Sequence, residues 1–122
     1  MLNLDTHILV HALAGDLRTS EHSLLTRNRW SVSAIVLWEL AKLVQLDRVN
    51  ADLHDREVVR ALNRVQVWPI DLAVAVTSTH LDFKGDPADE LIAATSIVHS
   101  VPLLTRDRAI LGSRIVPIAT AG

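Results

Sequence analysis

The segment LNLDTHILVHALAG, residues 2 to 15, places a short apolar run, a carboxylate and an apolar helical pattern in immediate succession. LNL (2 to 4) predicts a β-strand, and the pattern from 6 to 14 predicts a helix that Gly15 should end. Asp5 stands between the two elements. The segment therefore predicts one strand–helix unit of an α/β fold, with a carboxylate at the carboxyl end of the strand.

The rest of the sequence repeats this alternation. Further strands are predicted at WSVS (30 to 33), VQVWPI (65 to 70), VPLLT (101 to 105) and RIVPI (114 to 118), and helical patterns at 20 to 28, 34 to 47, 51 to 64, 71 to 83 and 87 to 100, with a short turn at 107 to 112. Strands that alternate with helices imply a mainly parallel sheet covered on both faces. The predicted fold class is α/β, a three-layer α/β/α sandwich, and a chain of 122 residues fits one domain over 1–122.

The composition excludes several classes of protein. The chain has no cysteine, so a disulfide scaffold, a thiolate zinc site and a cysteine nucleophile are excluded. The apolar runs are too short to span a bilayer, and the N-terminus MLNLD has a carboxylate where a signal peptide would be basic. We therefore expect a soluble cytoplasmic protein. Its net charge of −2 provides no global basic field, so any nucleic acid must be bound by local patches.

Four carboxylates, those of Asp5, Glu39, Asp89 and Asp107, each follow a predicted strand or lie on the helix that the strand feeds. Because groups at the carboxyl ends of parallel strands meet at one edge of the sheet, these side chains should converge. Carboxylates in one pocket repel each other, and a hard divalent cation with oxygen ligands relieves the repulsion. The pattern predicts a Mg²⁺ or Mn²⁺ site and phosphate chemistry.

Each carboxylate also has a simpler explanation. Asp5 and Asp107 stand at N-cap positions, and Asp89 lies in an acidic first turn that favours the helix dipole. Glu39 differs, since it lies inside a helix among apolar neighbours. It points either to water, with Lys42 as its ion-pair partner, or into a site where Lys42 would contact a phosphate.

Asp86 competes with Asp89 for the role of metal ligand. Asp86 precedes Pro87, and this pair predicts a helix that starts with an Asp cap and a proline at its first position. We favour Asp89 as the ligand and Asp86 as the cap.

Two patterns of basic residues are better explained without a bound ligand. His7 and His11 have the spacing of a zinc-binding pair, but a third strong ligand is not evident, so a role other than zinc binding is favoured. Arg56, Arg60 and Arg64 share one predicted helix face, which is more often solvated than bound to phosphate.

Four segments together resemble the motifs of PIN-domain ribonucleases, especially the VapC toxins of toxin–antitoxin pairs. They are LDTHILVHALAGD, SAIVLWELAKL, GDPADELIAATS and VPLLTRDRAI, in this order over nearly the whole chain. The resemblance implies that the acidic metal-binding quartet is Asp5, Glu39, Asp89 and Asp107, and that Thr105 is the hydroxyl residue two positions before the last acid. The chain departs from the family at Glu90, where arginine is more frequent, and at Gly85, where histidine is frequent.

The resemblance further implies a PIN-like sandwich that acts as a divalent-metal-dependent endoribonuclease, the toxin of a type II pair. It implies an RNA substrate, Mg²⁺ or Mn²⁺ as cofactor, a homodimer, and a cognate antitoxin that inserts a segment into the acidic groove. We expect substrate contacts from Thr105, Lys42, Arg106 and Arg108. Two alternatives stay open: a PIN-like scaffold that binds RNA or protein without catalysis, and an RNA-maturation nuclease with no antitoxin. The scaffold would be expected to have lost acidic residues, and all four positions keep theirs.

Overall fold

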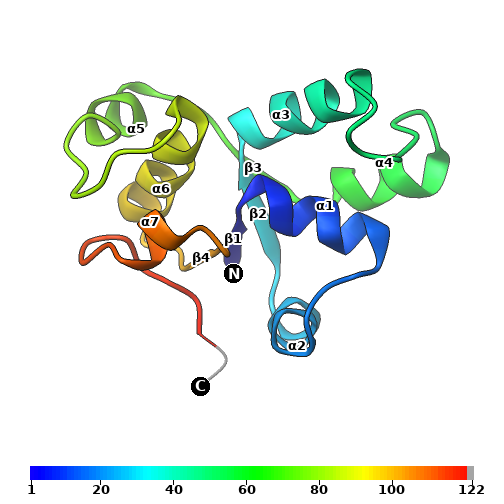
Figure 1. Cartoon of the computed structure of the whole chain (residues 1–122), viewed down its shortest axis with the longest axis horizontal. Helices are drawn as coiled ribbons and strands as arrows, with labels where there is room; N and C mark the ends of the chain where they lie inside the picture. The colour runs from blue at the N-terminus through cyan, green and yellow to red at the C-terminus, as the bar shows by residue number, and fades with distance from the viewer. Residues whose placement is uncertain (121–122) are drawn as a thin grey trace.

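The computed structural model describes residues 1–120, in which strands and helices alternate (Figure 1). The elements in chain order are β1 (Leu2–Leu4), α1 (Thr6–Ala14), α2 (Thr19–Arg27), β2 (Trp30–Ser33), α3 (Ala34–Gln45), α4 (Arg56–Asn63), β3 (Gln66–Trp68), α5 (Leu72–Thr77), α6 (Pro87–His99), β4 (Leu103–Leu104) and α7 (Arg108–Leu111).

The strands form one parallel sheet in the order β3-β2-β1-β4. The chain passes from β1 outward to β2 and β3, and then returns to add β4 on the other side of β1. The strand order therefore reverses between β1 and β4. In open α/β sheets this switch point is where a crevice opens at the carboxyl ends of the strands.

Helices cover the sheet on both sides, which confirms the α/β fold with a parallel sheet. In Figure 1, α1, α2 and α4 lie to the right of the strands, and α5 and α6 lie to the left. The side chain of Asn3 on β1 donates to Ser96 Oγ of α6 at 2.9 Å, so alternate residues Leu2 and Leu4 face the opposite layer. All three are buried, as a strand between two helical layers requires.

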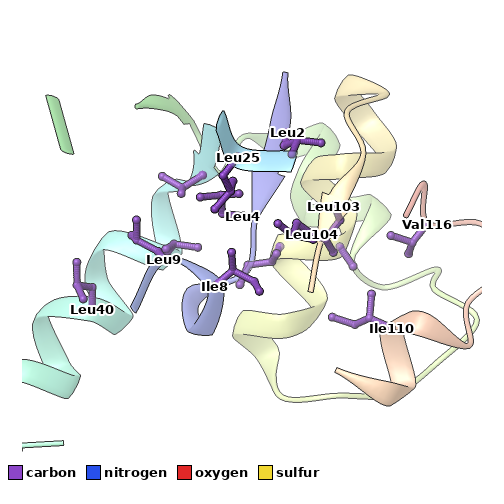
Figure 2. Close-up of a cluster of buried hydrophobic side chains, with 14 residues drawn as sticks. Leu2, Leu4, Ile8, Leu9, Leu25, Leu40, Leu103, Leu104, Ile110 and Val116 are labelled. Carbon is purple, nitrogen blue, oxygen red and sulfur yellow. The ribbon is translucent and has the colours of Figure 1, made fainter. Parts of the chain in front are cut away.

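One hydrophobic cluster joins the sheet to the helices of both layers. Its buried members are Leu2, Leu4, Ile8, Leu9, Leu25, Val32, Val36, Leu40, Ile92, Ala93, Leu103, Leu104, Ile110 and Val116 (Figure 2). Leu4 and Ile8 are fully buried on either side of Asp5 and Thr6 in the sequence. The first turn of α1 is therefore fixed by close packing, and with it the position of Asp5.

Several predicted boundaries are wrong, and local chemistry explains them. The predicted strand at 114–118 does not form, and the segment makes a single parallel bridge between Leu103 and Ile118. Pro117 lacks the amide that a longer ladder would need. The strand predicted at 65–70 is reduced to Gln66–Trp68 and stops before Pro69 for the same reason.

Two helices are much shorter than predicted. The helix predicted from 51 begins at Arg56, because Asp55 caps it by accepting from the amides of Glu57 and Val58. The helix predicted over 71–83 ends at Thr77 and continues as turns. None of the helices in residues 1–120 is long and apolar enough to cross a membrane.

Candidate active site

Asp5 lies at the switch point of the sheet, directly after β1, with only 3% of its surface exposed. Both of its oxygens are engaged. Oδ1 accepts from the Thr6 amide at 2.7 Å, and Oδ2 accepts from the Thr105 hydroxyl at 2.6 Å. Asp5 thus occupies the N-cap of α1, as predicted, and is also tied to the end of β4.

The Thr105 hydroxyl links two of the predicted site carboxylates. Besides donating to Asp5, it accepts from the Asp107 amide at 3.0 Å. Asp107 Oδ1 in turn accepts from the Ile110 amide at 3.0 Å and caps α7. Thr105 is buried, and its hydroxyl already has two protein partners. In this arrangement it orients Asp5 and Asp107.

Glu39 on α3 faces the site and not the Lys42 side chain. Its Oε1 accepts a hydrogen bond from the Thr6 hydroxyl. Lys42 donates instead to Gln45 Oε1 at 3.1 Å, and its ammonium stands 5.9 Å from the ring centroid of exposed Trp38. The first of the two predicted orientations of Glu39, toward water beside Lys42, is therefore wrong.

Thr6 was missed by the sequence interpretation. Its amide binds Asp5 and its hydroxyl binds Glu39, so one buried residue joins two elements of the site. The only sequence feature that marks Thr6 is its position directly after a strand-end carboxylate. This feature is weak, because threonine is common in the first turn of a helix.

Asp89 lies in the first turn of α6, and its pKa is raised from 3.8 to about 6. Burial is the largest cause, because it disfavours the charged form. The negative charges of Asp5, Asp107, Glu39 and Asp86 add to the effect in that order. The predicted carboxylates therefore lie near enough to Asp89 to act on its charge.

The carboxylates are near one another but do not enclose an ion as they stand. Within residues 1–120, no group of three His, Asp or Glu side chains has metal-binding geometry. The hydroxyls of Thr6 and Thr105 hold two of these side chains in their present orientations.

The prediction that the Asp86 side chain caps α6 is wrong in its detail. Asp86 occupies the N-cap position ahead of Pro87, but its side chain accepts no capping hydrogen bond. The amides of Ala88 and Asp89, which an N-cap side chain ordinarily binds, donate no hydrogen bond to it. Gly85 lies against Asp89, where an added Cβ would stand 3.4 Å from the Asp89 Cβ. The small residue keeps this side of Asp89 uncrowded.

Arg106 lies beside the carboxylates in an ion pair with Glu21 of α2. Its Nε donates to Glu21 Oε2 at 2.7 Å and its Nη2 to Glu21 Oε1 at 2.6 Å. This hydrogen-bonded contact lowers the pKa of Glu21 and raises that of Arg106. Arg106 also donates from Nη1 to His11 Nε2 at 3.1 Å.

These side chains border a cleft of about 270 Å³, lined by Asp5, His7, His11, Arg106 and Asp107. Both ring nitrogens of His11 have protein partners, because Nδ1 lies 2.7 Å from Asp16 Oδ1. His11 is thus engaged through both ring nitrogens, by Asp16 and by Arg106. Arg108 on α7 is exposed, as are Arg56, Arg60 and Arg64 along α4 and just beyond it.

Comparison with known proteins gives consistent matches. The family model for the PIN domain matches residues 3–112. Ribonuclease VapC22 of Mycobacterium tuberculosis is 37% identical over 87 residues, which cover 69% of this chain and 67% of that protein. A toxin–antitoxin complex from Klebsiella pneumoniae has a chain of similar fold, with a TM-score of 0.75 and 21% identity, over 100% of this chain and 98% of that one. VapBC2 of Rickettsia felis, bound to a DNA fragment from its promoter, gives a TM-score of 0.71 and 20% identity over 98% of each chain.

Proposed function

The chain belongs to the PIN domain family, and from that premise we propose that it is a divalent-metal-dependent endoribonuclease of the VapC type. The observation that carries the proposal is the group of carboxylates at the switch point of the sheet. Burial, together with the negative charges of Asp5, Asp107 and Glu39, raises the pKa of Asp89 to about 6. A bound cation would remove this penalty.

The donor set fits a hard divalent cation. We propose that carboxylate oxygens of Asp5, Glu39, Asp89 and Asp107 hold Mg²⁺ or Mn²⁺, with Asp86 as an additional candidate. The Asp86 side chain makes no capping hydrogen bond at the start of α6, which supports keeping it in the set. When bound, such an ion lowers the pKa of an attacking water and neutralises charge on the phosphate.

The protein's own contribution is to orient these oxygens. Thr105 and Thr6 fix the rotamers of Asp5 and Glu39 through hydroxyl hydrogen bonds, the kind of outer contact that tunes metal ligands.

The basic side chains around the site are the candidates for contact with the substrate. We propose that Lys42 and Arg108, which are exposed on α3 and α7, and Arg106, which lines the cleft, contact RNA phosphates. Thr105 was also predicted to contact substrate. Its buried hydroxyl supports an orienting role instead.

We further propose that the protein is a cytoplasmic toxin that forms a homodimer and is inhibited by a cognate antitoxin. The support is the likeness to VapC22 and to chains of known toxin–antitoxin complexes. A maturation nuclease would need no antitoxin. A small DNA-binding protein encoded next to this gene, and its co-purification with the chain, would separate the two.

The test is cleavage of RNA by the purified protein. Cleavage should stop in excess chelator and return with Mg²⁺ or Mn²⁺. Asp5→Asn should remove most activity while the protein stays folded, because asparagine fits the same space but lacks the charge. Asp55→Asn is the matched control, since Asp55 caps α4 and lies outside the cleft. Cleavage that persists in chelator, or an active Asp5→Asn protein, would contradict the proposal.

A further inference from the structure

We propose that Glu21 is a positioning residue that holds Arg106 in the orientation in which it binds an RNA phosphate at the acidic cleft. This inference rests on the proposed ribonuclease function. Glu21 itself lies on α2 and is not among the residues that line the cleft. It would act on RNA only through Arg106.

The Glu21 carboxylate is built into the protein as a fixed acceptor. It is only 5% exposed, and Oε1 accepts from the Arg18 amide at 2.8 Å in addition to Arg106. The two contacts to Arg106, at 2.6 and 2.7 Å, engage both oxygens and form the fork geometry of a bidentate pair. The guanidinium plane is therefore held in one orientation.

His11 holds the guanidinium from a second direction. Arginine can only donate, so His11 Nε2 must accept from Arg106 Nη1. The His11 ring is then neutral, with its proton on Nδ1, where it donates to Asp16 Oδ1 at 2.7 Å. One chain of hydrogen bonds thus runs from Asp16 through His11 and Arg106 to Glu21.

Arg106 keeps donors for a ligand. Its five N–H groups supply one bond from Nε, one from Nη2 and one from Nη1, which leaves one hydrogen on each terminal nitrogen. The side chain is 24% exposed and lines the same cleft as Asp5 and Asp107. The carboxylates of the cleft repel a phosphate of the RNA backbone. The oriented guanidinium of Arg106 beside these carboxylates would attract and bind it.

The direction in which one substitution changes RNA affinity separates a positioning role from an effect of net charge. Glu21→Gln removes a negative charge near the cleft, so charge alone predicts tighter RNA binding. Positioning predicts weaker binding, because glutamine offers one acceptor oxygen in place of two and the fork is lost. Glutamine keeps an acceptor for the Arg18 amide, so the start of α2 should survive.

The experiment measures binding of a short mixed-sequence single-stranded RNA in excess chelator, where cleavage does not interfere. We expect Glu21→Gln to weaken binding about fivefold, the effect of one net hydrogen bond. Arg106→Gln should weaken it and reduce the dependence of log K on log salt by about 0.7, one phosphate contact on a single strand. Arg27→Gln is the control, since Arg27 is exposed on the same helix and bonds to the Ser23 carbonyl outside the cleft.

Arg106→Lys keeps the charge but cannot form the fork, so it should also bind more weakly. This variant decides the question if Glu21→Gln does not fold. Binding by Glu21→Gln as tight as wild type, or by Arg106→Lys as tight as wild type, would overturn the inference. Wild-type protein that cuts RNA in Mg²⁺ while Glu21→Gln binds normally would leave the proposed function standing. Wild-type protein that neither binds nor cuts RNA would overturn both.

Discussion

Thr105 donates a hydrogen bond of 2.6 Å to Oδ2 of Asp5, across 100 positions of sequence. The bond joins the end of β4 to the end of β1, the two strands between which the sheet reverses its order. The same hydroxyl accepts from the Asp107 amide, so a single side chain sets the relative position of two proposed ligands. The first and last motifs of the sequence meet at this contact.

Thr105→Val tests this contact, because valine has nearly the same shape without the hydroxyl. Asp5 Oδ2 would lose its donor, and we expect the Mg²⁺ concentration for half-maximal cleavage to rise about tenfold or more. Stability should fall by about 1–2 kcal/mol, since a buried acceptor is left unpaired. A Mg²⁺ titration of cleavage and a denaturant titration measure the two effects.

Thr105→Ser is the matched control, because serine keeps the hydroxyl. It should retain most of the wild-type Mg²⁺ requirement. A Thr105→Val protein with an unchanged Mg²⁺ requirement would show that the hydroxyl does not orient Asp5 for the ion.

The pKa of Asp89 predicts a pH dependence of stability in the ion-free protein. The folded value of about 6 exceeds the ordinary 3.8, so the folded state holds this proton more tightly than the unfolded state. The resulting stability is fully present below about pH 4 and is lost as the pH rises through about 6. Asp89→Asn should therefore gain stability over wild type by on the order of 1–2 kcal/mol between about pH 4 and pH 7 in chelator.

Unfolding measured at both pH values in chelator checks this prediction. Saturating Mg²⁺ should reverse the order at neutral pH, because an ion bound only to the folded state stabilises the wild type and not a variant with a weakened site. An equal difference between the two proteins at both pH values would mean that Asp89 does not carry the unfavourable charge.

Asp86 and Asp71 provide a comparison of two N-caps. Asp71 accepts from the Val74 amide at 3.0 Å, whereas the Asp86 side chain accepts no capping bond. Asp71→Ala should cost about 1 kcal/mol of unfolding free energy, and Asp86→Ala less than about half of that. Denaturant titration compares them. An equal loss of stability in both variants would mean that Asp86 caps α6 in solution. A Mg²⁺ requirement that also rises in Asp86→Ala would mean that Asp86 shares the ion with Asp89.

The sequence permitted prediction of the features that depend on local patterns. The first strand and helix and their caps at Asp5 and Gly15 follow from apolar periodicity and capping chemistry, and the structure confirms them. For Glu39 the apolar helix left two orientations open, and the hydrogen bond from the Thr6 hydroxyl decides between them. The strand-end positions of Asp5 and Asp107 placed them at one edge of the sheet.

The remaining features depend on tertiary contacts between distant segments. Glu21 has no distinguishing local pattern, and its role depends on Arg106, which lies 85 positions away. The absent strand at 114–118 had the right composition, but the segment follows turns anchored by Asp82, whose side chain binds Ser113 and the Arg114 amide. Local propensity could not reveal that only one bridge would reach β4.

The chemical ends of the cut RNA test the central claim most directly. If water attacks the phosphorus at the acidic site, the 2′-hydroxyl has no chemical role, and the two products should carry a 5′-phosphate and a 3′-hydroxyl. End-group labelling and mass spectrometry of RNA cut in Mg²⁺ distinguish these ends. Fragments with 5′-phosphate and 3′-hydroxyl ends are the predicted result, and fragments with 2′,3′-cyclic phosphate ends would contradict it.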